Sequence, residues 1–392
     1  MRRLISLLLV ILLLVPSLAG AEDLTAEWME HAFRSRDVVG GAVIVSRYGE
    51  TVFTYTYGSK NARLMLPVTL NTCFRIASVT KMVTAVGLMQ LYDRGYFSLD
   101  APVSDYLPFQ VVNTAFKDDP ITVRQVLSHT TGLRQTQNSQ INWDYVSKRN
   151  TESLFVRFAR PGARYIYSNA NGGLFGALIE SLTGQSMNTY MSQNVFRPLG
   201  MNAAYAAGLL PDASDISSRL TKSGGSMLSP EYAVGMEYED TCDPARHLEY
   251  SVGGLYTSAN SLNRLGMMLC NEGYLDGVRI LSPYTVRLMQ ADQRQEPGSS
   301  VTGDSRYGLG IQRYTDTYGN VWYGHQGITD GLSSDLFYLP EKGLVVTVIA
   351  NGYTPQKFDT LAAIASLTME RAVETNWDRY VRHTAFTFGA DE

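Results

Sequence analysis

The chain has 392 residues, of which 45% are hydrophobic and 18% charged, a globular composition long enough for one large domain or two closely packed ones. Its formal net charge is −4 and it contains no basic run, so nucleic acid and anionic membrane surfaces are poor candidates for partners. The five histidines lack any metal-ligand spacing and the three cysteines match no metal pattern, so we expect neither a metal nor another cofactor.

The first 21 residues have the pattern of a secretory signal peptide. Arg2 and Arg3 precede an apolar run over residues 4–15, and the small residues at 19–21 are typical of a cleavage site. The apolar run is shorter than a typical membrane span, although an uncleaved anchor is the alternative. We expect a mature chain from about residue 22, exported by a bacterium to the periplasm or the medium, with no stable membrane anchor after cleavage.

A hairpin and one very apolar helix are expected in the N-terminal part. Within residues 41–58, two β-rich runs flank Tyr48-Gly49-Glu50, which predicts a hairpin. Residues 78–94 are apolar on most faces, as in a helix that lies in the middle of a protein, and Gly95 is placed to end it.

Helices and loops are expected in the middle of the chain, from about residue 110 to 240. Amphipathic patterns predict helices within 122–133 and within 169–201, with glycines placed to end them at Gly132, Gly184 and Gly200.

Strand signals return near the C-terminus, at 320–327, 332–340 and 343–351. A short turn separates the last two, so we expect them to be antiparallel, and a helix at about 356–375 follows. Strands at both ends with helices between them predict an α/β (α+β) fold: one sheet built from about 25–105 and 250–375, and a helical part at about 106–249.

Cys73, Cys242 and Cys270 are widely spaced, and at most one pair of them could form a disulfide. Cys73 lies shortly before Ser78 and could be mistaken for a nucleophile. We interpret it as a buried thiol or as half of a disulfide.

Ser78-Val79-Thr80-Lys81 is an S-x-x-K motif at the start of the apolar helix. Residues three apart lie on one face of a helix, and free N–H groups in its first turn favour an oxyanion. Burial there lowers the pKa of a lysine, so that Lys81 could accept the proton of Ser78 near neutral pH. The alternative is a capping serine with a lysine that extends to solvent.

Tyr167-Ser168-Asn169 is a Y-x-N motif on a predicted loop before a helix. A tyrosine hydroxyl beside an amine can share a proton with it, activate Ser78 and later protonate a leaving group. The amide of Asn169 can both donate to and accept from a substrate amide.

His325-Gln326-Gly327 ends a predicted strand, where a glycine lets another backbone lie against the strand edge. Taken alone, His325 could be an ordinary histidine at the end of a strand. The order S-x-x-K, Y-x-N, H-x-G on helix, loop and strand is more specific than any one of the three motifs.

With these motifs in this order, the chain resembles the serine β-lactamase and penicillin-binding-protein superfamily. The likeness is to the branch that contains class C β-lactamases, D-alanyl-D-alanine carboxypeptidases, D-aminopeptidases and related esterases. It extends from about residue 40 to 370 and is carried by the segments 74–108, 121–133, 161–184, 196–201, 253–262, 307–311, 324–327 and 338–351.

The resemblance implies an antiparallel sheet flanked by helices, next to an all-helical region, with the active site in the cleft between them. It implies that Ser78 is the acylated nucleophile and that Lys81 and Tyr167 transfer its proton.

The resemblance also implies groups that bind the substrate. Asn169 would contact the substrate amide, and His325 and Gly327 would form the third motif of the site. The backbone N–H groups of Ser78 and Ile328 would form the oxyanion hole.

The third motif departs from that of class C β-lactamases, which usually carry Lys-Thr-Gly there. A histidine is mostly neutral at pH 7, so His325 would not supply the fixed positive charge of a lysine. The motif is closer to that of D-alanyl-D-alanine carboxypeptidases and D-aminopeptidases. Gln326 replaces the common threonine, and Asp330-Gly331 replaces the usual Pro-Gly.

Our leading hypothesis is therefore an exported serine hydrolase that acts on D-amino-acid peptides, such as the stem peptides of peptidoglycan. A second hypothesis is an esterase or a class C-type β-lactamase, which would need the same three catalytic residues and which the sequence cannot separate from the first. A third is a non-catalytic binding protein of the same fold. In each enzymatic case the partner is a small peptide, ester or β-lactam.

Overall fold

The computed structural model describes residues 23–36, 38–61, 63–134, 154–156, 159–220, 226–236, 238–293, 306–329, 331–352 and 358–377. The expected signal peptide and its cleavage site lie outside these residues, as does Asp330 of the Asp-Gly pair.

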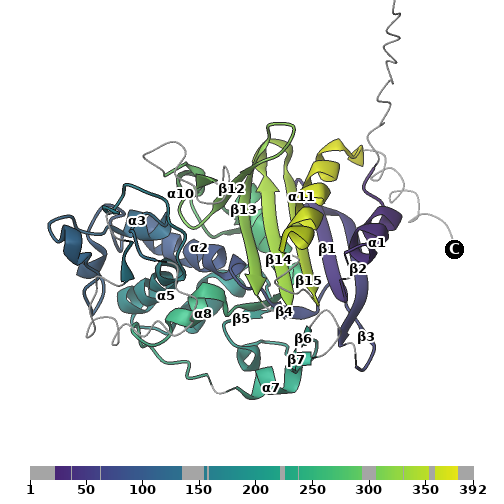
Figure 1. Cartoon of the computed structure of the whole chain (residues 1–392), viewed down its shortest axis with the longest axis horizontal. Helices are drawn as coiled ribbons and strands as arrows, with labels where there is room; N and C mark the ends of the chain where they lie inside the picture. The colour runs from purple at the N-terminus through teal and green to yellow at the C-terminus, as the bar shows by residue number, and fades with distance from the viewer. Residues whose placement is uncertain are drawn as a thin grey trace, which may run out of the picture.

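An eight-stranded antiparallel sheet forms one part of the molecule (Figure 1). In spatial order its strands are β11 (Arg306–Tyr307), β12 (Gln312–Thr315), β13 (Val321–Thr329), β14 (Leu332–Leu339), β15 (Leu344–Asn351), β1 (Gly40–Arg47), β2 (Glu50–Asn61) and β3 (Leu66–Pro67). β1 pairs with β15 along its full length, from Gly40 opposite Asn351 to Arg47 opposite Leu344. The two ends of the chain therefore close one sheet, as the sequence predicts.

The turns of this sheet follow the predicted glycines. Tyr48 and Gly49 connect β1 to β2 with φ angles of 51° and 84°, the left-handed conformation that suits a two-residue hairpin. Gly343, with a φ of 62°, starts the return from β14 into β15. Both predicted hairpins are confirmed.

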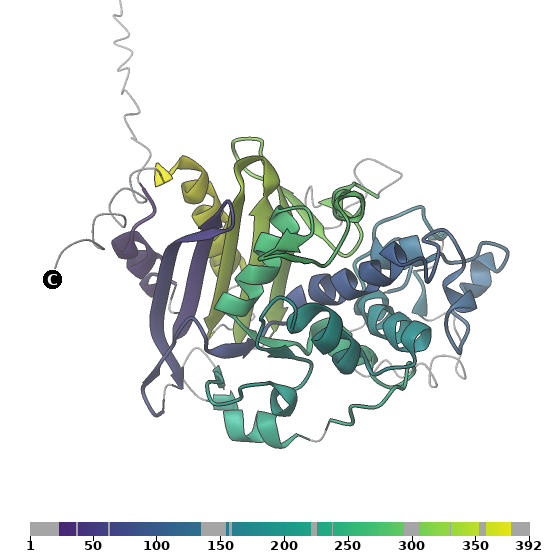
Figure 2. The ribbon, with the colours of Figure 1, turned by 180° about the vertical axis from the view of Figure 1, so that it is seen from behind.

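Helices cover both faces of the sheet. α1 (Ala26–Arg34) and α11 (Phe358–Glu374) pack on one face, and α2 (Val79–Asp93) and α9 (Ala259–Cys270) pack on the other (Figures 1 and 2). Every residue of β14 and β15 is buried as a result. Alternate residues of these strands belong to two separate apolar clusters, one on each face.

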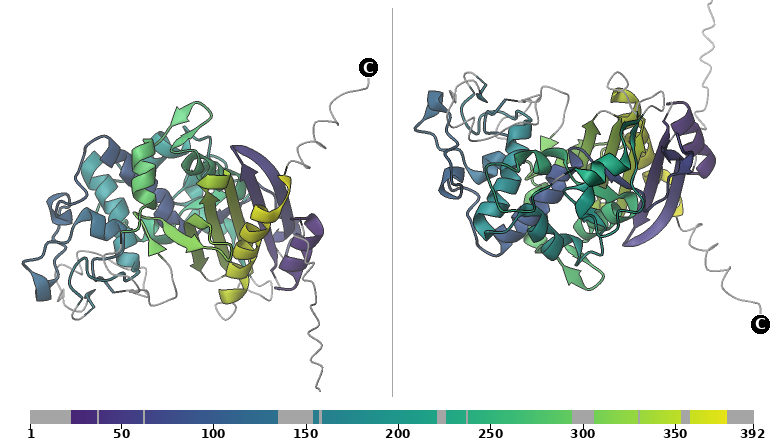
Figure 3. Two further views of the ribbon diagram at one scale, coloured as in Figure 1. Left: turned by 90° about the horizontal axis from the view of Figure 1, so that it is seen from above. Right: turned by 90° about the horizontal axis from the view of Figure 1, so that it is seen from below.

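The helical part lies beyond the β13 side of the sheet, and β2 and β3 lie at the far end (Figure 3). Its elements are α3 (Val123–Leu127), α5 (Asn169–Thr183), α6 (Met187–Met191), a π-helical turn (Ser192–Phe196) and α8 (Leu248–Gly253). Below the main sheet, α7 (Pro230–Gly235) packs near two small sheets, β4 (Cys73–Arg75) with β8 (Tyr256–Ser258) and β5 (Ala203–Ala204), and β6 (Arg219–Leu220) with β7 (Ser226–Leu228). α10 (Pro283–Gln290) and the hairpin β9 (Tyr274–Leu275) and β10 (Val278–Arg279) complete the fold.

The helix expected over 122–133 is much shorter than predicted, since α3 covers only Val123–Leu127. A capping box starts it: the Thr122 hydroxyl accepts from the N–H of Gln125, and the Gln125 side chain accepts from the N–H of Thr122. His129 has a φ of 56°, which a right-handed helix cannot include. The prediction of one continuous helix is wrong there, because the chain leaves the helix to place His129 in the site described below.

α2 connects the two parts of the molecule. All its residues from Val79 to Leu91 are buried, as its apolar pattern predicts, and Gly95 follows its end with a φ of 76°. The helix contacts α5 and α8 on one side and β13 and β14 on the other. Its first turn therefore lies where the sheet meets the helical part.

The three cysteines all lie in the described part of the chain, and none is in a disulfide. Burial, and then the charge of Asp215, raises the pKa of the Cys73 thiol to about 12, so this residue is a buried, unreactive thiol. No helix among the described residues is both long and apolar enough to span a membrane.

Candidate active site

The first turn of α2 presents Ser78. The preceding residue, Ala77, has a φ of 46°, a left-handed backbone conformation that is unfavourable for any residue with a Cβ atom. Ser78 is the N-cap of α2, yet its side chain makes no capping hydrogen bond. The partly exposed hydroxyl therefore remains available for chemistry.

Lys81 is fully buried one turn further along α2. Its Nζ lies 3.0 Å from Ser78 Oγ and donates a 2.8 Å hydrogen bond to the carbonyl of Val252 in α8. A Cβ on Gly172 of α5 would lie 2.6 Å from Cε of this lysine, so the glycine makes room for its stem. Burial lowers the pKa of Lys81 to about 7. Near pH 7 a large fraction of the molecules therefore holds this amine in its neutral form beside the serine hydroxyl.

Tyr167 lies close to Lys81, in the loop that precedes α5. Its ring centroid is 5.1 Å from Lys81 Nζ. Its hydroxyl is buried and makes no hydrogen bond of normal geometry with the described residues. Burial raises the pKa of this hydroxyl well above its usual value, and the nearby Ser78 hydroxyl offsets this only in part. Tyr167 is therefore a neutral phenol that can accept or pass on a proton only together with Lys81.

His129 lies behind Tyr167. The two rings stack with centroids 4.5 Å apart and an interplanar angle of 26°. The Nδ1 atom of His129 accepts a 3.1 Å hydrogen bond from the N–H of Ser168, which assigns the proton to Nε2. Burial and the nearby Lys81 hold its pKa well below the usual value, so the ring is neutral. Sequence reasoning missed this residue because it assigned residues 122–133 to a helix.

His325 is buried in β13, and both of its ring nitrogens have partners. Nδ1 donates to the carbonyl of Gln326 at 2.6 Å, and Nε2 accepts from the hydroxyl of Tyr307 at 3.0 Å. Burial, and then the nearness of Lys81, lowers its pKa to about 3. The ring is therefore neutral, and its predicted contact with a substrate would require one of these two bonds to break.

Gly327 brings β13 directly against the start of α2. A Cβ on this residue would lie 2.9 Å from the backbone nitrogen of Ser78 and closer still to the carbonyl oxygen of Ile76. The Ser334 hydroxyl of β14 donates a 2.6 Å hydrogen bond to that same carbonyl. Only a glycine permits this approach, which places the Ser78 amide beside the strand that carries Ile328. The oxyanion hole formed by these two amides stays a prediction.

Asn169 is the first residue of α5, two positions after Tyr167, and it is partly exposed. The Ser168 hydroxyl caps the helix by accepting from the N–H of Ala170. The structure thus brings Ser78, Lys81, Tyr167 and Gly327 together from a helix, a loop and a strand. The described residues contain no group of three His, Cys, Asp or Glu side chains suited to a metal ion.

Comparison with known proteins identifies relatives along most of the chain. The family model described as "Beta-lactamase" matches residues 23–368. Penicillin-binding protein 4 of Amycolatopsis lactamdurans is 27% identical over 344 residues, which are 86% of this chain and 87% of that protein. Esterase EstB of Burkholderia gladioli is 32% identical over 190 residues, 44% of this chain and 48% of the esterase.

A solved structure supports the same relationship. The crystal structure of SurE with D-Leu is 25% identical and superposes with a TM-score of 0.66, covering 89% of this chain and 75% of that one. The antiparallel sheet with flanking helices therefore has known counterparts over almost all of the chain.

Proposed function

Since this chain belongs to the Beta-lactamase family of serine hydrolases, we propose that it hydrolyses short peptides at D-amino acids through an acyl-enzyme on Ser78. One observation carries the proposal: the fully buried Nζ of Lys81, whose pKa is lowered by burial to about 7, lies 3.0 Å from the Ser78 hydroxyl. Burying a charged lysine without an acidic partner costs free energy, so the buried amine loses its proton more easily. A lowered pKa beside a hydroxyl group is typical of a catalytic site.

The proposed reaction begins with proton transfer from Ser78 Oγ to Lys81 Nζ while Oγ attacks the substrate carbonyl. The N–H groups of Ser78 and Ile328 would stabilise the negative oxygen of the tetrahedral intermediate. The C–N bond then breaks, and the proton held by Lys81 passes through Tyr167 to the leaving amine. A water molecule hydrolyses the resulting ester by the same steps in reverse order and regenerates Ser78.

The third motif separates this chain from class C β-lactamases, which usually carry a lysine at the position of His325. The H-x-G motif resembles that of D-alanyl-D-alanine carboxypeptidases and D-aminopeptidases, and the buried, uncharged imidazole supplies no fixed positive charge for a substrate carboxylate. The similar protein SurE was solved with D-Leu, and penicillin-binding protein 4 is a relative along most of the chain. D-amino-acid peptides of the peptidoglycan type are therefore the substrates that we propose.

An esterase is the second candidate, because the relative with 32% identity is an esterase and would need the same three catalytic residues. Ester hydrolysis lacks the demand for a protonated leaving amine, so it would depend less on Tyr167 than peptide hydrolysis does. The neutral His325 argues against a class C-type β-lactamase, and the lowered pKa of the amine beside Ser78 argues against a non-catalytic binding protein.

We also propose that the protein is exported to the periplasm or the medium, because its first 21 residues have the pattern of a signal peptide.

Fluorescent penicillin tests the nucleophile. The mature protein should form a covalent adduct that mass spectrometry maps to Ser78, and Ser78→Ala should form none. Equal labelling of the two proteins would disprove the mechanism.

A substrate panel then separates the candidates. Nitrocefin, p-nitrophenyl butyrate and a peptide ending in D-alanyl-D-alanine should be compared at equal enzyme concentration. We expect the highest kcat/KM for the peptide. Rapid nitrocefin turnover would identify a β-lactamase instead, and turnover of the butyrate ester alone would identify an esterase.

A further inference from the structure

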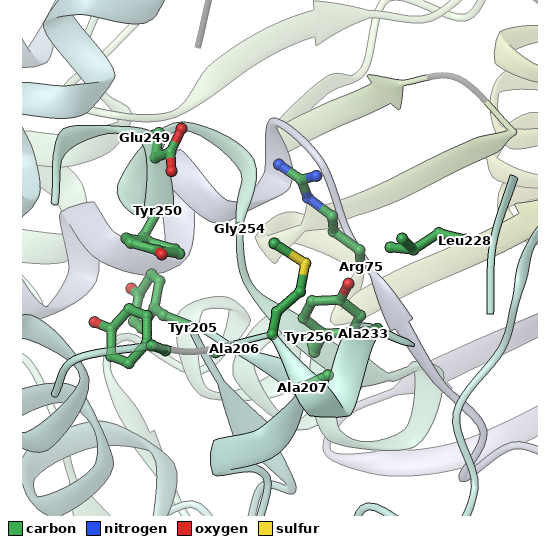
Figure 4. Close-up of a pocket in the computed structure, with 12 residues that line it drawn as sticks. Arg75, Tyr205, Ala206, Ala207, Leu228, Ala233, Glu249, Tyr250, Gly254 and Tyr256 are labelled. Atoms are coloured by element: carbon green, nitrogen blue, oxygen red, sulfur yellow. The ribbon is translucent and has the colours of Figure 1, made fainter. Parts of the chain in front are cut away.

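A cavity of about 200 Å³ lies beside α8, which contributes Glu249 and Tyr250 to its lining (Figure 4). Four tyrosines line it, and each comes from a different segment: Tyr205 follows β5, Tyr238 follows α7, Tyr250 lies in α8 and Tyr256 in β8. None of them has a role in the reaction described above.

The walls of this cavity, here called the tyrosine pocket, are apolar and partly formed by small side chains. Ala207 and Ala233 are buried against it and leave the space open. Tyr238 and Tyr250 meet edge to face, with centroids 4.5 Å apart at 81°. An apolar cavity of about 150 Å³ can hold a benzene molecule, so the tyrosine pocket has room for a substituted ring. Aromatic walls favour a ring as the occupant.

The rim of the tyrosine pocket is polar and carries both signs of charge. Arg75 and Glu249 point their charged ends to the same side of it (Figure 4). The terminal guanidinium nitrogens of Arg75 make no hydrogen bond or ion pair within the described part of the chain. The buried hydroxyl of Tyr238 likewise has no partner among those residues. A rim with both donors and a carboxylate suits the amide of a peptide.

The tyrosine pocket and Ser78 are separated by one short stretch of backbone. The carbonyl of Val252 accepts from Lys81 Nζ, and that of the next residue, Gly253, accepts from Arg75 Nε at 2.7 Å. A Cβ on Gly253 would lie 3.4 Å from Ala77, the residue before the nucleophile. Arg75, on the rim of the pocket, precedes Ser78 by three residues, which span at most about 11 Å of backbone, so the rim lies within reach of the acyl chain of a substrate bound at Ser78.

We propose that the tyrosine pocket selects the substrate by binding an aromatic or bulky apolar side chain in its acyl half, several bonds from the scissile carbonyl. This inference rests on the proposed acyl-enzyme at Ser78 and adds the class of acyl group that the site prefers.

Two esters that differ only in the acyl group test the inference. p-Nitrophenyl 5-phenylpentanoate places a ring five bonds from the carbonyl, and p-nitrophenyl acetate has no group that could reach the pocket. The wild type should show a kcat/KM at least tenfold higher for the phenyl ester. Ala233→Phe fills the pocket and should lower the ratio of the two kcat/KM values by at least tenfold.

Val234→Phe is the matched control, since it adds the same ring to the neighbouring, exposed position, which does not line the pocket. It should leave the ratio unchanged. Ala233→Leu fills less of the pocket and should lower the ratio of the two kcat/KM values by a smaller factor. It replaces Ala233→Phe in the test if the phenylalanine variant does not fold. The acetate burst counts active enzyme in every preparation.

The possible outcomes separate the two claims. Acetate turnover that Ser78→Ala does not abolish would overturn the proposed function. Turnover that depends on Ser78, with a ratio that neither Ala233 variant changes, would overturn the pocket alone. If neither ester reacts, calorimetric binding of 5-phenylpentanoate still tests the pocket, and equal binding by the wild type and Ala233→Phe would contradict it.

Discussion

Lys81 has no acidic partner within the described part of the chain, and burial alone lowers its pKa to about 7. Two neutral imidazoles, His129 and His325, lie close enough for their pKa values to be lowered by its charge. A site that keeps both rings uncharged adds no second positive charge beside the lysine. At the residue level, burial thus keeps both imidazole rings neutral and lowers the pKa of Lys81 until its neutral form is populated near pH 7.

The pH dependence of acylation follows from this state of Lys81. The amine accepts a proton only when it is unprotonated, so kcat/KM should fall about tenfold per pH unit below pH 7. Above pH 7 it should reach a plateau, because the Tyr167 hydroxyl stays protonated. A pH–rate profile with p-nitrophenyl acetate from pH 5 to 9 measures this. A flat profile down to pH 5 would contradict the assignment of Lys81 as the base.

His129 should act as a positioning residue for Tyr167. His129→Ala removes the stacked ring and leaves the Ser168 N–H without its acceptor, which costs about 1–3 kcal/mol of folding free energy. Because Tyr167 transfers a proton rather than holding the substrate, kcat for peptide hydrolysis should fall about tenfold with little change in KM.

His129→Phe should restore much of kcat, because it keeps the stacking surface, but not the lost stability. His31→Ala, at an exposed position in α1, is the control and should alter neither quantity. A KM change without a kcat change in His129→Ala would contradict the positioning role.

At the level of elements, the site depends on how closely β13 approaches the start of α2. Neither element provides the contact alone: Gly327 removes the side chain that would otherwise separate them, and Ser334 of the next strand bonds the Ile76 carbonyl at the same point. Gly172 has the same function between α5 and Lys81. The two glycines thus set the spacing of three elements around Ser78.

Gly327→Ala should therefore displace β13 from Ser78. Its Cβ would lie too close to two backbone atoms, which cannot rotate away as a flexible side chain could. We expect a loss of acylation of about a hundredfold, measured with p-nitrophenyl acetate, because misplacing an oxyanion-hole donor has effects of this size. Gly235→Ala, which meets nothing within 4 Å, should behave like the wild type. An active Gly327→Ala enzyme would show that the close approach is not needed.

At the level of the whole molecule, the sheet and the helical part share one core. A single apolar cluster includes residues of α2, α5, α9 and β14, and the strands from the two chain ends pair along β1 and β15. Unfolding of either part would expose the buried face of α2. The two parts should therefore unfold together.

Leu178→Ala in α5 tests this coupling. Leu178 is fully buried in the helical part, so the substitution should cost about 2–5 kcal/mol. Three of the four tryptophans, Trp28, Trp322 and Trp377, belong to or pack against the apolar cluster on one face of the sheet, and Trp143→Phe in the same background removes the fourth. Tryptophan fluorescence and far-UV circular dichroism should shift to the same lower denaturant midpoint. A circular dichroism transition that moves alone would show that the helical part unfolds independently.

The sequence by itself determined which elements form and which residues are candidates for the chemistry. The apolar pattern of α2, the hairpin at Tyr48-Gly49, the antiparallel return at Gly343 and the three motifs were all readable, because they depend on spacing and on local turn chemistry. The end of α3 was not readable, since a favourable capping box and an apolar pattern gave no sign of the positive φ at His129.

Only the tertiary structure decided how the candidates are arranged and in which protonation state they lie. The carbonyl of Val252, the space left by Gly172 and the stacking of His129 on Tyr167 all join residues far apart in the chain, which no local pattern encodes. The lowered pKa values of Lys81, His129 and His325 also follow from burial, because the free energy of a charge depends on what surrounds it in space rather than on its neighbours in sequence.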